Sequence, residues 1–251
     1  MKKNILIFGL LSFFAINFSQ ANTEPSSNKV HYAEGDRLFS WASFLNLRSE
    51  PHQDAKVLAM IPRGSVIQIL MDQTESRTHK VALVPDYAPS EDSYTYHKGE
   101  SLHGNWVQVE YEGLQGYVFD GYLSKIIPIR SKKGDSPGDI FTHYLLDHYQ
   151  GAVITEPGEE EIFDEKVVTP KGNLTYTHFF NYDCEVFELD MHGVMLQEAL
   201  MIMTKVFRVD GISHREDGKY FLVNKDDPYS NLVVEKTEEG SRISIWWCEG
   251  C

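Results

Sequence analysis

The 251-residue chain is poor in cysteine, with three in all, and has no long apolar run after Phe18. A helix that spans a membrane needs roughly 20 apolar residues, so we expect the mature chain to be soluble. Two cysteines near the C-terminus without a second pair make a poor zinc site, and we expect neither a metal nor a cofactor. The chain also lacks a phosphate-binding glycine loop and a serine nucleophile elbow, which removes the motif evidence for those two enzyme classes.

Basic residues are scarce as well. The chain has 23 Lys and Arg against 37 Asp and Glu, a formal net charge of -14, and no basic cluster. Such a chain is repelled by nucleic acid and by anionic membrane or wall polymers. We therefore expect a neutral, zwitterionic or locally basic partner. The acidity is explained equally well as an aid to solubility.

The first 21 residues have the pattern of a secretory signal peptide. Lys2 and Lys3 precede an apolar run from Ile5 to Phe18, and Ala21 ends a short polar stretch. We predict cleavage after Ala21 and export to the periplasm or the extracellular space, without stable membrane insertion. A retained anchor is the alternative. Loss of the two lysines lowers the basic count from 23 to 21 against 37 acids, so the net charge becomes -16.

The three cysteines are Cys184, Cys248 and Cys251. Export to an oxidising compartment favours a disulfide, and one thiol is then left over. We favour the pair Cys184 and Cys248, because both lie in strand-like runs that could be neighbours. Cys248 and Cys251 have CxxC spacing, but no helix follows them as a redox site would require.

The stretch from Leu45 to Leu123 reads as short strands cut by turn residues, which is typical of a small barrel. In Trp106 to Tyr111 apolar and polar residues alternate, as in a half-buried strand. Gly113 can take a positive φ in the short hairpin connection that follows. The expected strands are Leu38–Leu47, Val57–Ile61, Val66–Leu70, Trp106–Tyr111 and Gly116–Phe119.

The motifs in this stretch resemble those of the bacterial SH3-like domain. The matching residues are Leu45, Asn46, Leu47, Arg48, Ser49, Pro51, Val57, Gly64, Trp106, Gly113, Gly116, Tyr117, Val118, Tyr122 and Leu123. The resemblance covers about residues 38–128. It implies a small β-barrel that binds cell-wall peptides or serves as a targeting or docking module, usually without catalysis.

The resemblance divides the candidate residues into two groups. The structural motif consists of Asn46, Arg48, Pro51, Gly64, Gly113 and Gly116, and the resemblance implies that Arg48 ties the first turn to the barrel. The ligand-binding candidates are Trp106, Tyr117 and Tyr122, with Tyr94 and Tyr96, because aromatic grooves suit peptides. We expect one of Trp106 and Tyr117 in the core and the other in the groove, without deciding which.

A long insertion, Met71 to Gly104, departs from the family pattern and supplies Tyr94 and Tyr96. Lys80 to Val84 is strand-like, so the insertion can form an extended hairpin. It would then cover the usual groove or supply a new one. A tolerated surface loop is an equally good interpretation, because long loops cost little closure entropy.

Residues 135–251 read as a second domain of α+β class, with an antiparallel sheet and two helices, and they resemble no family we recognise. Ser136 is the expected N-cap of a helix that ends near Tyr149, with Pro137 at its first position. A second helix is expected from about Gly193 to Phe207. The expected strands are Leu174–Tyr182, Cys184–Leu189, Gly218–Val223, Leu232–Lys236 and Arg242–Cys248. Residues 22–37 are expected to be a flexible leader.

The sequence favours an exported, non-enzymatic binding or docking protein of the cell envelope, whose partner is a cell-wall peptide or an envelope protein. A protein partner bound by the C-terminal domain is one alternative. A wall hydrolase is another, either a cysteine peptidase that uses Cys184 with His192 or His214, or a zinc amidase. The amidase would draw on His178, His192, His214 and Glu188, which share no metal-binding spacing. We assign no catalytic residue and leave the oligomeric state open.

Overall fold

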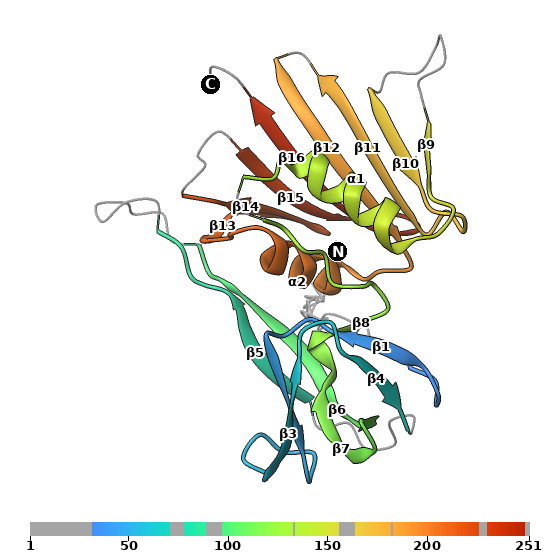
Figure 1. Ribbon diagram of the computed structural model, residues 1–251. Helices are drawn as coiled ribbons and strands as arrows, with labels where there is room; N and C mark the ends of the chain where they lie inside the picture. The colour runs from blue at the N-terminus through green and yellow to red at the C-terminus, as the bar shows by residue number, and fades with distance from the viewer. Residues whose placement is uncertain are drawn as a thin grey trace, which may run out of the picture.

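The computed structural model describes residues 32–70, 78–88, 97–132, 134–155, 164–181, 183–225 and 230–248. They form two antiparallel sheets with two α-helices (Figure 1), so the fold is mainly β with an α+β part, as predicted. The signal peptide, Tyr94, Tyr96 and Cys251 lie outside the described residues. Within them, neither helix is long and apolar enough to cross a membrane.

The first sheet is the small barrel. Its strand order is β3-β2-β7-β6-β4-β1-β8, with β5 paired to β6. A 3-10 turn, Asp120–Tyr122, lies between β7 and β8. The strands are β1 (Arg37–Ser40), β2 (Phe44–Arg48), β3 (Val57–Pro62), β4 (Val66–Ile69), β5 (Thr78–Val84), β6 (Glu100–Tyr111), β7 (Leu114–Phe119) and β8 (Leu123–Ser124).

The single strand predicted over Leu38–Leu47 is wrong, because the chain divides there into β1 and β2. Trp41 lies at the break and is fully buried. Its backbone N–H donates to the carbonyl of Tyr122, and its indole leaves the barrel interior for a different core. A strand that continued through Trp41 could not place the indole there.

The β6–β7 hairpin follows the prediction. Its two-residue loop holds Glu112 at φ 49° and Gly113 at φ 78°, the pair of positive angles that a type I′ turn requires. Along β6 the side chains alternate as expected. Val107 and Val109 fill the barrel core, whereas Trp106 points to the opposite face.

Part of the predicted flexible leader is instead packed against the barrel. Tyr32 is 7% exposed and belongs to the barrel core. The N–H of Gly35 donates to Ile69, and Lys125 pairs with Asp36 at 3.2 Å. The prediction of a flexible leader is therefore wrong for residues 32–37, because burial of Tyr32 anchors them.

The second sheet has the order β13-β14-β15-β16-β12-β11-β10-β9. Helices α1 (Pro137–His148) and α2 (Leu196–Val206) pack on one of its faces, where Tyr176, Leu189 and Ile243 share a row. The strands are β9 (Val153–Thr155), β10 (Glu165–Val168), β11 (Leu174–Asn181), β12 (Cys184–His192), β13 (Gly211–Glu216), β14 (Lys219–Val223), β15 (Ser230–Lys236) and β16 (Gly240–Cys248).

The sequence reading missed β9, β10 and β13, and it placed the start of α2 too early. The helix begins at Leu196 rather than near Gly193, because β12 continues to His192 and pairs there with Gly240. Gly193 then has a positive φ of 74° and its N–H donates to the carbonyl of Glu239, so a turn separates the strand from the helix. The five strands that were predicted in this part are present with small changes at their ends.

Two local predictions in this part are confirmed. Ser136 caps α1 by accepting from the N–H of Asp139 at 3.1 Å, and the Asp139 carboxylate accepts in return from Ser136. These hydrogen bonds lower the pKa of Asp139. The structure also contains the disulfide between Cys184 and Cys248, which lie directly opposite each other on β12 and β16.

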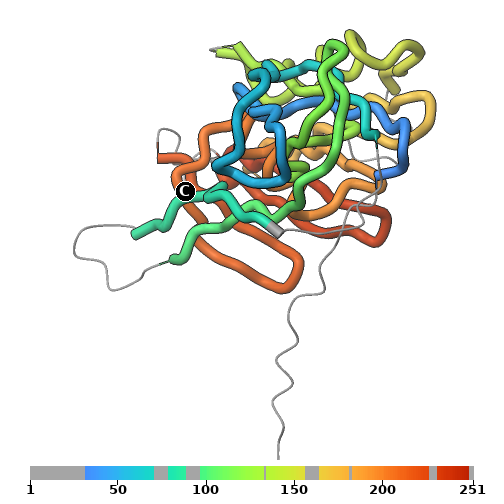
Figure 2. Tube along the Cα trace, turned by 90° about the horizontal axis from the view of Figure 1, so that it is seen from below, coloured from blue at the N-terminus to red at the C-terminus, as the bar shows by residue number. Residues whose placement is uncertain are grey.

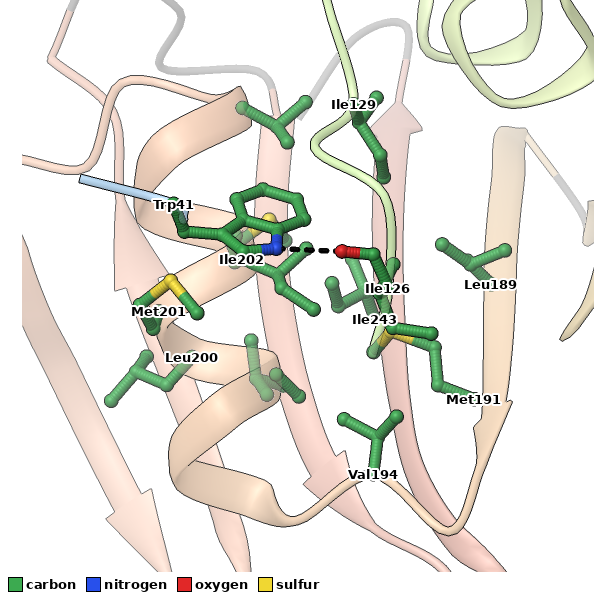
Figure 3. Packing of buried hydrophobic residues seen from close by; sticks show 14 of the residues in the cluster. Trp41, Ile126, Ile129, Leu189, Met191, Val194, Leu200, Met201, Ile202 and Ile243 are labelled. Atoms are coloured by element: carbon green, nitrogen blue, oxygen red, sulfur yellow. Dashed lines mark hydrogen bonds between the residues drawn. The ribbon is translucent and has the colours of Figure 1, made fainter. Parts of the chain in front are cut away.

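The barrel and the second sheet share a continuous core, shown in Figure 3. The indole N–H of Trp41 donates to the carbonyl of Ile126 at 2.9 Å, and the Trp41 ring lies among residues of α2. The guanidinium of Arg63 stacks over this ring at 5.2 Å and donates to the carbonyls of Lys205 and Ile129. The division into domains 38–128 and 135–251 stays a prediction.

The described part of the insertion forms the predicted hairpin, since β5 pairs with the first half of β6. The hairpin reaches the edge of the second sheet and lies beside β13 and β14 (Figure 2). Arg215 pairs with Glu100 at 3.1 Å and donates to the carbonyl of Gly99, while the hydroxyl of Tyr220 donates to Glu100. This part of the insertion therefore fastens the barrel to the sheet and is not a free surface loop.

Candidate functional site

A groove of about 480 Å³ lies on the outer face of the barrel. Along β2, Leu45 and Leu47 point into the barrel core, so the alternate residues Phe44, Asn46 and Arg48 point outward and line the groove. The loop after β2 adds Gln53 and Asp54, and β5 adds His79 and Val81. The ends of β6 and β7 and the turn that follows add Trp106, Phe119 and Tyr122.

Four rings form a connected aromatic group in the groove. The ring of His79 lies 5.8 Å from Trp106 and 5.4 Å from Phe119, which it meets edge-on. Phe119 in turn meets Tyr122 edge-on at 5.8 Å. Edge-to-face contacts of this kind hold the rings in fixed orientations. Trp106 and Phe119 are buried, so His79 and Tyr122, which are half-buried, are the more accessible rings of this preformed aromatic surface.

The polar groups lie around this aromatic surface. Burial raises the pKa of Tyr122, so its hydroxyl stays protonated at neutral pH and can donate a hydrogen bond. Asp54 is largely exposed at the rim, with His52 Nδ1 3.7 Å from its carboxylate. The guanidinium of Arg48 is already hydrogen-bonded to the protein, because its Nη1 donates to the carbonyl of Ala55 at 2.7 Å. The groove thus combines an aromatic surface with amides, the Arg48 guanidinium and one exposed carboxylate.

The aromatic candidates from the sequence are only partly brought together. Trp106 and Tyr122 line the groove, whereas Tyr117 does not and packs against the shared core. Trp106 is 9% exposed and belongs to that core too, so the expected division between a core ring and a groove ring is too simple. Tyr94 and Tyr96 lie outside the described residues.

Sequence reasoning missed three aromatic groove residues, Phe44, His79 and Phe119, as well as Gln53, Asp54 and Val81. Alternation along β2 could have identified Phe44, because residues two apart in a strand lie on the same face and Phe44 therefore shares the face of Asn46 and Arg48. Phe119 lies directly opposite Trp106 on the neighbouring strand, so the two side chains lie on the same face of the sheet. No local signal identifies His79, since its place depends on the pairing of β5 with β6 across a long loop.

The motif residues have mainly structural surroundings. The hydrogen bond from Arg48 to Ala55 is the contact that the resemblance implies for this residue. At Gly116 a Cβ would lie 2.6 Å from the carbonyl oxygen of Arg48, so β2 and β7 can cross here only with glycine. Gly64 has a positive φ of 87° in its turn, and Pro51 lies in the loop after β2. Asn46 differs, because its side chain lines the groove.

The residues considered for a hydrolase do not converge. Cys184 lies in a strand and is bound to Cys248. His178 lies 3.0 Å from Glu185, His192 pairs with Glu239, and His214 is beside Glu216. Over the described ranges, no three His, Cys, Asp or Glu side chains are arranged to hold a metal ion.

The fold and the groove define a small β-barrel binding module. Residues 43–124 match the family model described as the bacterial SH3 domain, which confirms the resemblance found in the sequence. The match ends before α1 and says nothing about residues 135–251. Searches of curated proteins and of solved structures gave no match for this chain.

Proposed function

We propose that this protein is an exported, non-enzymatic binding protein of the cell envelope whose barrel holds a cell-wall peptide in the groove. The observation that carries the proposal is the connected aromatic surface of His79, Trp106, Phe119 and Tyr122, bordered by polar side chains. The bacterial SH3 domain match supports a cell-wall binding module in general terms.

A peptide fits this chemistry better than a charged polymer does. Ordered aromatic rings offer large contact area at low entropic cost, and the amides of Asn46 and Gln53 can bond peptide groups. The net charge of -14 and the carboxylate of Asp54 at the rim oppose an anionic ligand. A zwitterionic or amine-bearing peptide is therefore the proposed ligand, and an extended segment of an envelope protein is the second candidate.

Export is supported by two independent features. The first 21 residues have the pattern of a signal peptide. The disulfide between Cys184 and Cys248 is of a kind that persists in oxidising compartments.

The test is calorimetric titration of residues 22–251 with peptides released from purified peptidoglycan. The matched variants are Phe44→Ser in the groove and Phe180→Ser on the second sheet, because these phenylalanines are 65% and 59% exposed. We expect binding by the wild type, about tenfold weaker binding by Phe44→Ser, and no change in Phe180→Ser. Absence of binding, or equal losses in both variants, would contradict the proposal.

A further inference from the structure

The hydrogen-bond pattern between β2 and β3 shows which way each backbone group of β2 points. The N–H of Arg63 donates to the carbonyl of Ser43, which identifies these two residues as a hydrogen-bonded pair. Such pairs alternate along antiparallel strands. Leu45 and Leu47 therefore bond to β3, whereas Phe44 and Asn46 do not.

Phe44 and Asn46 lie opposite Pro62 and Met60 of β3. Pro62 has no N–H to donate, which agrees with this assignment. The N–H and C=O groups of Phe44 and Asn46 must then point away from β3, toward β7. Their side chains line the groove, so both backbone and side chains of these residues border it.

Strand β7 does not use these backbone groups. It pairs with β2 only at Arg48 and Tyr117, the crossing next to Gly116. Beyond that point β7 turns away at Asp120, whose carboxylate accepts from the N–H of Asn105 at 2.6 Å. Among the described residues, no strand pairs with Phe44 or Asn46 on this side.

We propose that the groove takes its ligand as an extended peptide that adds to β2 as a further strand. The ligand backbone bonds the N–H and C=O groups of Phe44 and Asn46, and alternate ligand side chains face the aromatic surface. An open strand edge is a template for another chain, and its donors and acceptors repeat at the spacing of a peptide backbone. The inference rests on the proposed function and specifies that the cell-wall peptide binds in an extended conformation.

Amide hydrogen exchange followed by NMR tests this geometry with controls inside one strand. In the free protein we expect fast exchange at Phe44 and Asn46 and slow exchange at Leu45 and Leu47, which bond to β3. Addition of peptides released from peptidoglycan should slow exchange at Phe44 and Asn46 specifically. If all four amides were protected before any peptide is added, the inference that this edge of β2 is unpaired would be overturned.

A pair of variants gives an independent measurement. Phe44→Ala and Phe44→Pro both remove the ring, but only proline removes the N–H that faces the groove. Because that N–H makes no hydrogen bond to β3, both variants should fold, and a thermal melt would verify this. We expect Phe44→Pro to bind the peptides about fivefold more weakly than Phe44→Ala does.

The outcomes separate the two proposals. In one outcome, peptides shift the NMR signals of Trp106 and Tyr122 and leave the amide exchange of Phe44 and Asn46 unchanged. That result would overturn strand addition, but the groove would still be the binding site. Equal affinities of the two Phe44 variants would have the same meaning. Peptides that shift no signal in the barrel would overturn both the proposed function and the strand addition.

Discussion

Trp41 occupies a position that its sequence neighbours do not reveal. It lies between two barrel strands, yet its indole is buried in the core shared with α2, and its N–H bonds the carbonyl of Ile126. Arg63 closes over the same ring. A tryptophan between two short strands would ordinarily be assigned to the barrel, so the contact could not be predicted from the local pattern.

The substitution Trp41→Phe should destabilise the protein by about 2 kcal/mol, because it leaves a small cavity and a buried carbonyl without its donor. Urea unfolding followed by circular dichroism would measure the change. Trp247→Phe is the matched control, since Trp247 is 42% exposed and should change little. Equal stability of the Trp41→Phe variant and the wild type would show that the contact does not join the two parts.

Glu198 on α2 gives a pH-dependent prediction. Burial raises the pKa of its carboxyl, against opposing hydrogen bonds from Ser124 and the Met195 backbone. A raised pKa means that, as the pH rises, the folded state keeps the proton of Glu198 after the unfolded state has lost it. Stability from this group is therefore present at low pH and is lost as pH rises through the raised value.

Glu198→Gln should consequently unfold at a higher urea concentration than the wild type at neutral pH. The difference should disappear as the pH falls below the ordinary range of a glutamate. Glu238→Gln, at an exposed position, serves as the control. A Glu198→Gln variant that is less stable than the wild type at neutral pH would contradict the direction of the pKa shift.

At the scale of elements, short-range chemistry was predictable and long-range pairing was not. The cap of α1 and the β6–β7 turn depend on residues within three or four positions, and both were read correctly. Strand β13 lies at the edge of the sheet and pairs, among the described residues, with β14 alone, and β9 is a three-residue strand whose side chains are all exposed. Neither strand is therefore marked by apolar alternation in the sequence. The start of α2 was placed too early because a turn with a positive φ at Gly193 separates β12 from the helix.

The cap of α1 supports a quantitative prediction. Ser136→Ala removes the hydroxyl that accepts from Asp139 N and should cost about 1 kcal/mol of unfolding free energy. Ser136→Asp keeps a capping acceptor and should lie close to the wild type. Urea unfolding of the three proteins would check this, and identical midpoints for the alanine and wild-type proteins would contradict it.

Within the groove, the sequence identified Trp106 and Tyr122 because aromatic positions of the family motif are conspicuous. It could not identify His79, which reaches the groove only through the register of β5 on β6. The free edge of β2 was also beyond sequence reasoning. It depends on where β7 parts from β2, and the pairing of these two strands stops at Arg48 and Tyr117 although β7 stays paired with β6 as far as Phe119.

For the whole molecule, the disulfide between Cys184 and Cys248 closes a loop with a sequence separation of 64. Its loss in a double substitution to alanine should lower stability by about 3 kcal/mol, chiefly through a freer unfolded chain. A reducing agent should destabilise the wild type and leave the double variant unchanged. Cys251→Ser is the control, and a reductant effect that persists in the double variant would contradict the pairing.

The two parts of the chain are joined by more than their linker. The shared core, the Arg63 contacts and the Glu100–Arg215 pair hold the barrel against the second sheet. The sequence suggested two separate units because the bacterial SH3 motif ends near Leu123. The joining residues lie far apart along the chain and carry no motif of their own.

The central claim is that the barrel binds a cell-wall component without cleaving it. The most direct measurement is incubation of residues 22–251 with purified peptidoglycan, scoring both co-sedimented protein and released fragments. We predict that the wild type sediments, that Phe44→Ser sediments less while Phe180→Ser matches the wild type, and that no fragments are released. Protein that stays in the supernatant, or fragments released above background, would contradict the claim.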